Sequence, residues 1–215
     1  ELAKKILLSN NNVLVEKPFA LSIEDAAQLV EISEKKSLSL MVGHLLLFHP
    51  AINKIKQLID EGIIGPLKYI YSNRLNFGKI RKNENVFWSL APHDISLFQY
   101  FSNSVPVKIK SQGLDMIQEN VYDSYTALFE YKNGIKAHLF TSWAHPFKEH
   151  RLVFAGTEGF LTFEDSSKDK NIIFHKKFFI PSGDFYKESI ADDKIISYGN
   201  RMPLTDLLLH FVNHL

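Results

Sequence analysis

The sequence predicts a chain of two parts, an α/β part followed by an α+β part whose open, mostly antiparallel sheet carries flanking helices. In the first part, short apolar runs follow helix-like stretches, which is the order found in βαβ units. In the second part, Asn133-Gly134 separates two alternating apolar runs, which is a strong signal for a β-hairpin. We assign residues 1–45 to the first part and residues 46–215 to the second.

The elements up to Gly62 follow from their caps and apolar spacing. Ser22 is expected to open a helix, with Asp25 completing a variant of the capping box. Pro50 fits the first position of the next helix, and Gly62 fits its end. Helices are therefore expected over 1–8, 22–36 and 50–61, and strands over 13–15 and 38–42.

The second part is predicted to be rich in strands. A helix is expected to start near Pro92 and to end near Phe101. Asn133-Gly134 favours a type I′ turn between the strands of the first hairpin. The remaining expectations are strands over 67–75 and 172–180, hairpins of 125–131 with 135–143 and of 151–155 with 160–163, a loop over 181–202 and a helix over 203–215.

Composition excludes several classes of protein. The 25 Lys and Arg residues nearly balance the 24 Asp and Glu residues, which argues against a nucleic-acid partner. The absence of cysteine excludes a disulfide scaffold and any zinc or iron–sulfur site held by cysteine. No apolar run reaches the roughly 18 residues that cross a bilayer, and no signal-peptide pattern is present. We therefore expect no membrane partner and a cytoplasmic location.

The ends of the sequence indicate a piece of a longer protein. The first residue is Glu1 rather than Met, and the helix expected over 203–215 ends without a capping residue.

The first candidate for chemistry is Glu16-Lys17-Pro18, which follows a buried strand. Ligands of open α/β sheets bind at the carboxyl ends of the strands. A lysine placed there can donate to a substrate hydroxyl or stabilise a developing oxyanion. The alternative is a solvated lysine in a turn.

The second candidate is His93, because Pro92 to Asp94 is expected to open a helix. The positive end of a helix favours the neutral imidazole, and thus a base that works near pH 7. Asp94 fits the first helical turn, where a carboxylate is favoured. The alternative is a capping His-Asp pair with no catalytic task.

Other polar groups stand near predicted strand ends. Arg74 and Arg81 could hold an anionic group, or they could lie on a solvated strand face. Trp143 and Lys148 place an aromatic ring and a cation near one rim.

Two histidines stand close together in the sequence, and several motifs are missing. His44 and His49 are not at a metal-binding spacing, and they are typical of hydrogen-bonding or packing residues, so we expect no metal site. The given residues contain neither a phosphate-binding glycine loop nor the nucleophile elbow of hydrolases.

Four segments, in this order, resemble the Gfo/Idh/MocA family of NAD(P)-dependent sugar oxidoreductases over essentially the whole chain. They are Glu16-Lys17-Pro18, the segment from Gly43-His44 to His49-Pro50, Ala91-Pro92-His93-Asp94 and Gly156-Thr157-Glu158-Gly159. The helix expected over 203–215 also resembles one near the family's C-terminus. Residues 88–96 are similar to members that act on nucleotide-linked sugars.

The resemblance implies an N-terminal Rossmann domain, of which residues 1–45 are the C-terminal remnant. It implies that residues 46–215 form a truncated substrate and oligomerisation domain, which would assemble a homo-oligomer through its open sheet. The family's glycine-rich turn should lie upstream of Glu1.

The resemblance also implies roles for single residues. Lys17 matches the active-site lysine, and His93 matches the acid/base histidine beside the reacting hydroxyl. Ser89 stands where the family often has Asp, and a serine cannot hold a negative charge, which leaves the proton transfer to Lys17 and His93. The residues expected near the nicotinamide of NAD or NADP are Glu16, Lys17, Pro18 and His44. The residues expected near the substrate are Arg74, Ser89, Asp94, Trp143 and Lys148.

These observations predict hydride transfer between a nicotinamide and a secondary alcohol of a sugar, including a nucleotide-linked sugar. The alternative is a non-catalytic sugar-binding or oligomerisation module that lacks a complete dinucleotide site, which Ser89 favours. A His-dependent hydrolase or isomerase is a third, weaker hypothesis.

Overall fold

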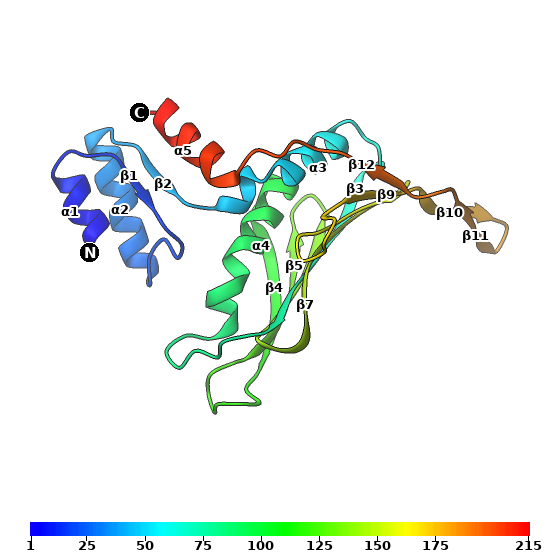
Figure 1. The fold of residues 1–215 in the computed structure, drawn as a ribbon, viewed down its shortest axis with the longest axis horizontal. Helices are drawn as coiled ribbons and strands as arrows, with labels where there is room; N and C mark the ends of the chain where they lie inside the picture. The colour runs from blue at the N-terminus through cyan, green and yellow to red at the C-terminus, as the bar shows by residue number, and fades with distance from the viewer. The chain divides into compact units, whose positions relative to one another are not determined.

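The computed structural model describes all 215 residues, and they pack as two compact units. The first unit consists of residues 1–49 and 200–215, and the second of residues 50–199. Figure 1 follows the chain through both units by colour. No helix of the chain is both long and apolar enough to cross a membrane.

The first unit is built on two parallel strands. β1 (Val13–Val15) pairs with β2 (Leu40–Val42), with Val15 opposite Val42. Its core is formed by Leu7, Val13 and Leu29, which come from one helix, one strand and the next helix. The helical elements of this unit are α1 (Leu2–Leu8), α2 (Ile23–Lys36), the 3₁₀ helix η1 (Leu45–Phe48) and α5 (Pro203–Asn213).

The predicted start of α2 is confirmed. The Ser22 hydroxyl accepts a hydrogen bond from the Asp25 backbone N–H at 3.0 Å, so it satisfies one of the unpaired amides of the first turn.

Helix α5 closes the first unit, although it comes last in the sequence. The Ser39 hydroxyl donates to the His214 carbonyl at 2.9 Å. The rings of Phe48 and His210 lie 5.3 Å apart between centroids. Residues 200–215 therefore pack with the first unit, whereas the sequence division grouped them with the second part.

The second unit is an open sheet of eight strands in the order β12-β9-β8-β7-β3-β6-β5-β4. Only β3 and β6 run parallel, and all other neighbours are antiparallel. This confirms the predicted mostly antiparallel sheet. The strands are β3 (Leu67–Phe77), β4 (Pro106–Leu114), β5 (Ser124–Tyr131), β6 (Lys136–Ser142), β7 (Ala144–Gly156), β8 (Phe160–Glu164), β9 (Ile172–His175) and β12 (Lys194–Ile196).

Helix α4 (Val86–Ser102) packs on β3, β5 and β6. Phe98 lies edge-on to Phe129 with 5.7 Å between ring centroids, and Phe101 lies 4.3 Å from Phe154. Each such buried ring stabilises the fold by about 2–3 kcal/mol through removal of apolar surface from water. Helix α3 (Pro50–Asp60) precedes β3 and presents its own apolar stripe to the same unit.

The expected start of α4 near Pro92 is wrong. The helix begins at Val86, because the Asn85 side chain accepts a hydrogen bond from the Trp88 backbone N–H at 3.0 Å. Val86 is fully buried, which anchors this first turn in the core. Pro92 lies inside the helix, where its missing N–H leaves one rung of the hydrogen-bond ladder unmade.

The hairpin of β5 and β6 is confirmed, but its expected type I′ turn is wrong. That turn needs a positive φ at both Asn133 and Gly134, and only Gly134 has one, at 83°. The Gly134 N–H donates to the Tyr131 carbonyl at 2.9 Å. The loop is therefore a turn of three residues with glycine in the left-handed position.

The expected strand over 172–180 and loop over 181–202 are also wrong in part. β9 ends at His175, and β10 (Lys177–Ser182) pairs with β11 (Phe185–Ile190) in a separate two-stranded hairpin. Both faces of this hairpin meet solvent, so its sequence lacks the alternation by which a half-buried strand is recognised.

Candidate functional site

The strand ends of the first unit form one candidate edge. β1 and β2 are parallel, so Glu16-Lys17-Pro18 and Gly43-His44 follow their carboxyl ends on the same side. The Gly43 N–H donates to the Val15 carbonyl at 2.7 Å, and a Cβ on Gly43 would lie 3.6 Å from the Glu16 carboxyl carbon. The structure therefore brings the four residues expected near the nicotinamide to one edge of one sheet. The bond between Lys17 and Pro18 is cis.

His44 presents an unsatisfied polar atom at this edge. Its Nδ1 is buried and has no hydrogen-bond partner within the chain. Burial lowers the pKa of this imidazole, so the neutral ring is favoured near pH 7. A neutral imidazole can donate or accept one hydrogen bond, which suits a polar ligand group.

A hollow of about 540 Å³ lies beside the same loop in the first unit. It shares Val15 and Pro18 with the strand ends, and helices α1 and α2 supply most of its remaining lining. Glu16, Lys17 and His44 do not line it, so the hollow adjoins the candidate edge only at Val15 and Pro18.

The second candidate centre lies on α4 in the second unit. His93 is in the middle of the helix, so the expected placement at a positive helix end is wrong. Ser89 lies one turn earlier, at the spacing that puts two side chains on one helix face. Ser89 is buried and His93 is half-buried. Lys17 belongs to the first unit and His93 to the second, and their joint role stays a prediction.

Asp94 and Arg74 form a buried ion pair. The fully buried Asp94 carboxylate accepts from Arg74 Nε at 2.6 Å and Nη2 at 3.0 Å, and from the Ser72 hydroxyl at 2.7 Å. Burial works against the Arg74 charge, but Asp94 outweighs it and raises the pKa of the guanidinium. Both groups were predicted to contact substrate. In the structure they bind each other instead, and this ion pair joins α4 to β3.

His150 joins this cluster from the neighbouring strand, in register with Arg74. Burial, with the nearby Arg74 and Lys148 charges, lowers the pKa of His150 to about 4. The residue is therefore neutral near pH 7. Sequence reasoning missed both His150 and Ser72. Their only sequence signal was strand alternation, and alternation does not reveal which strands pair.

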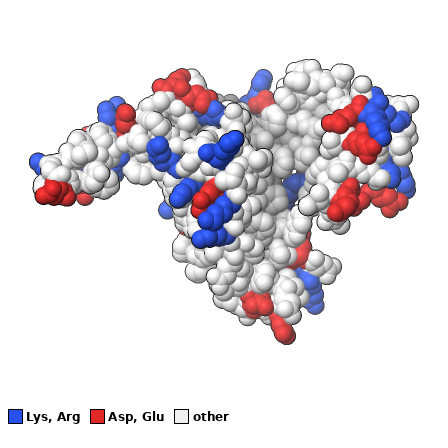
Figure 2. All heavy atoms as spheres, turned by 180° about the vertical axis from the view of Figure 1, so that it is seen from behind, with Lys and Arg blue, Asp and Glu red and all other residues white.

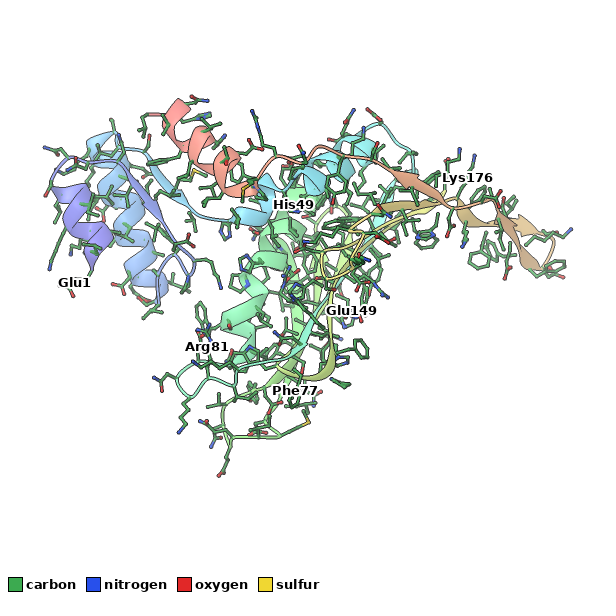
Figure 3. The ribbon with its side chains drawn as sticks, in the orientation of Figure 1. Glu1, His49, Phe77, Arg81, Glu149 and Lys176 are labelled. Carbon is green, nitrogen blue, oxygen red and sulfur yellow. The ribbon has the colours of Figure 1, made fainter.

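The remaining predicted contacts lie in different environments. Trp143 lies between β6 and β7 and is 3% exposed. Its ring therefore packs in the core, where a substrate could not contact it. Lys148 is exposed on β7. Arg81 lies in the loop between β3 and α4 (Figure 3) and pairs with Glu84.

Two family models match the chain. The model described as the GFO/IDH/MocA C-terminal domain covers residues 52–162, which is just over half of the chain. The model described as an oxidoreductase family with an NAD-binding Rossmann fold covers residues 1–44.

Curated relatives point to the same family. The chain is 30% identical over 142 residues to UDP-N-acetylglucosamine 3-dehydrogenase of Acidithiobacillus ferrooxidans, covering 66% of this chain and 44% of the relative. It is 26% identical over 162 residues to 2,7-anhydro-N-acetylneuraminate hydratase of Mediterraneibacter gnavus, covering 69% of this chain and 43% of that protein. The chain thus spans less than half the length of these relatives.

A solved structure shares the fold. A crystal form of UDP-N-acetylglucosamine 3-dehydrogenase from Acidithiobacillus ferrooxidans superposes with a TM-score of 0.83 at 22% identity, covering 99% of this chain and 65% of that chain. The match over more than half of the residues and the shared architecture agree: the chain belongs to the GFO/IDH/MocA family of oxidoreductases.

Proposed function

We propose that the protein containing this chain transfers a hydride between NAD or NADP and a secondary alcohol of a sugar. The observation that carries the proposal is the edge formed by Glu16, Lys17, Pro18 and His44 at the ends of two parallel strands, in a segment matched by an NAD-binding family model. Ligands of open α/β sheets bind at such an edge.

The residues at the edge fit a nicotinamide. The buried His44 Nδ1 has no partner within the chain, so a polar group of the cofactor would satisfy it. Glu16 and Pro18 are exposed and Lys17 is half-buried, which leaves them open to a ligand. When bound, the nicotinamide supplies the hydride chemistry.

The chain's own residues handle the proton and the charge. We assign Lys17 to hydrogen-bond the reacting oxygen and to stabilise the alkoxide that develops there. His93 takes the hydroxyl proton in the oxidation direction and returns it in the other. Because His93 lies in mid-helix, its basicity does not come from a helix end. We assign Ser89, which lies one turn before His93, to hydrogen-bond a sugar hydroxyl.

A nucleotide-linked sugar is the substrate class that we favour. Similarity to a UDP-N-acetylglucosamine 3-dehydrogenase supports this choice. Lys148 is exposed and offers a cation to an anionic group. The Arg74 guanidinium is bound to Asp94, so its charge is not offered to the substrate. We also propose that the protein is a homo-oligomer that assembles through its open sheet.

The test is nicotinamide reduction by the protein expressed from its complete reading frame, with UDP-N-acetylglucosamine as the first substrate. His93→Ala and Lys17→Ala are each expected to lower kcat by about 10²–10⁴-fold. Lys168→Ala changes an exposed loop lysine and serves as the matched control.

Two results would oppose the proposal. Near-normal turnover in both folded variants would remove Lys17 and His93 from the chemistry. A folded protein that binds neither NAD nor NADP, as measured by calorimetry, would favour the non-catalytic sugar-binding module.

A further inference from the structure

His210 and His214 stand four residues apart at the C-terminal end of α5. Their rings lie close together, with 4.2 Å between centroids and 36° between planes. Both side chains are exposed. Residues at i and i+4 share one face of a helix, and two histidines at this spacing can bind one metal ion together. The metal-binding spacing that His44 and His49 lack is therefore present in this pair.

The ring of His214 is held in one orientation by the backbone. Its Nδ1 lies 2.7 Å from the His210 carbonyl oxygen. A carbonyl oxygen only accepts, so in the neutral ring Nδ1 carries the hydrogen and Nε2 keeps a free lone pair. Metal-binding histidines are commonly oriented in this way, with the second ring nitrogen donating to a carbonyl or carboxylate. The His214 carbonyl itself accepts from the Ser39 hydroxyl at 2.9 Å, which ties this residue to the first unit.

The ring of His210 is restricted by a second contact in the same unit. It packs against Phe48, with 5.3 Å between ring centroids. Two nitrogens that bind one ion at about 2.0–2.1 Å lie roughly 3 Å apart. The 4.2 Å separation of the two imidazole centroids is compatible with that distance. Little side-chain freedom remains to be lost on binding, so the pair is preorganised for a shared ion.

The electrostatics of α5 also favour a cation at this end. The helix contains no Lys or Arg, and its C-terminus carries a partial negative charge. Figure 2 shows a largely uncharged surface where α5 lies. Asp206, the one acidic residue of the helix, lies in its first turn and pairs with Arg201 at 3.1 Å. The imidazoles are therefore the metal-binding groups that this end of α5 offers.

We propose that His210 and His214 bind one divalent transition-metal ion of the first row through their imidazole nitrogens, with water completing its coordination shell. Imidazole is a ligand for Zn²⁺, Cu²⁺ and Ni²⁺, and among these Cu²⁺ should bind most tightly. Mg²⁺ and Ca²⁺ prefer oxygen ligands, so they should not compete. The site lies within the first unit and does not depend on the proposed activity.

A metal bound there would stabilise the first unit. α5 completes this unit, and the ion would join two residues of its last turn next to the contacts with Ser39 and Phe48. The unfolded chain does not hold the two imidazoles together, so the ion binds the folded state more tightly and shifts the equilibrium toward it.

Calorimetric titration of the chain without an affinity tag, in a buffer near pH 7, tests the site with CuCl₂, NiCl₂ and ZnCl₂. One ion is expected to bind per pair of histidines. His210→Gln and His214→Gln are each expected to raise the dissociation constant at least about tenfold, since loss of an outer-shell partner alone costs about 10–100-fold. His145→Gln removes a histidine of the second unit and is the matched control, which should bind as wild type does.

A second variant separates the spacing of the histidines from their number. Val212→His combined with His214→Val keeps two histidines on α5 but sets them roughly 200° apart around the helix. Val212 is 60% exposed, so the exchange leaves the core untouched. Binding should weaken as in the single variants. Electron paramagnetic resonance of the Cu²⁺ complex should show coupling to two imidazole nitrogens in wild type and to fewer in His214→Gln.

Stability gives an independent measurement of the same site. Zn²⁺ should raise the urea midpoint of the first unit, followed by far-UV circular dichroism, and a chelator should reverse the shift. Folded His210→Gln should show no such shift, whereas His145→Gln should show the full one.

Three results would overturn the proposal. The first is an absence of saturable binding of all three ions by the wild-type chain. The second is binding by folded His210→Gln as tight as that of wild type, which would assign the ion to other residues. The third is equally tight binding by the variant with separated histidines, which would show that their spacing on α5 is irrelevant.

Discussion

Asp94 balances the charge of Arg74 inside the second unit, where the Arg74 side chain is only 11% exposed. Asp94→Asn would keep the shape but leave the guanidinium buried without its counter-charge. We expect the free energy of unfolding to fall by about 3–5 kcal/mol, measured by urea titration. Glu84→Gln breaks the more exposed pair with Arg81 and should cost less than about 1 kcal/mol. A similar loss in both variants would contradict the structural role of Asp94.

His150 makes stability depend on pH. The unfolded chain takes up a proton at this residue near its ordinary pKa of 6.5, whereas the folded protein resists protonation down to a pKa of about 4. The contribution of His150 to the free energy of unfolding is therefore complete above pH 6.5 and is lost as the pH falls toward 4. Because His150 is partly exposed, we expect about 1 kcal/mol.

His150→Gln isolates this contribution. Other groups also titrate, so the quantity to measure is the wild-type stability minus the variant stability at pH 7 and at pH 4.5. That difference should shrink at the lower pH. A constant difference would show that His150 is not resisting protonation in the folded state.

Two helix ends were readable from single residues, whereas side-chain partnerships were not. Ser22 and Gly62 mark the ends of α2 and α3 through their local chemistry. Arg74 on β3 meets Asp94 because α4 packs over β3 at these residues, and neither sequence segment predicts that packing. His150 joins them because the register of β3 and β7 sets it opposite Arg74. Long-range register leaves no mark on one strand's sequence.

At the scale of elements, the turn that joins β7 and β8 is hydrogen-bonded to the segment before β3. The Ile64 carbonyl accepts a hydrogen bond from the Glu158 N–H at 2.8 Å. A Cβ on Gly156 would stand 2.0 Å from the same carbonyl oxygen, which is a clash with backbone. Gly156→Ala should therefore lower the free energy of unfolding by about 1–3 kcal/mol, measured by urea titration.

Gly199→Ala is the control for this prediction. A Cβ on Gly199 would meet nothing within 4 Å, and its φ is not positive, so the change should be nearly neutral. Equal stability of the two variants would show that the turn has room to move.

The start of α4 shows why element boundaries were harder to predict than element types. Pro92 is a strong local signal for a helix start, and Asn85 is an equally good capping residue. Burial of Val86 decides in favour of the earlier start, and burial is a property of the packed unit. The hairpin of β10 and β11 was missed for a related reason, since strands exposed on both faces show no apolar alternation.

At the scale of the molecule, the two units have separate cores of different size. The core cluster of the first unit contains three buried apolar residues, Leu7, Val13 and Leu29, so this unit should unfold at a lower urea concentration. Trp88 and Trp143, the only two tryptophans, both lie in the second unit. Tryptophan fluorescence should therefore report the later transition alone, whereas far-UV circular dichroism should report both. Coincident transitions would contradict this expectation.

The packing of α5 with residues 1–49 has a consequence for biosynthesis. Residues 1–49 leave the ribosome before residues 50–199, and the helix that completes their unit is made only after both. At about 5–20 residues per second, synthesis of the intervening 150 residues delays α5 by roughly 8–30 s. The second unit can therefore fold on the nascent chain while residues 1–49 still lack α5, so chaperones should bind residues 1–49 in preference to residues 50–199.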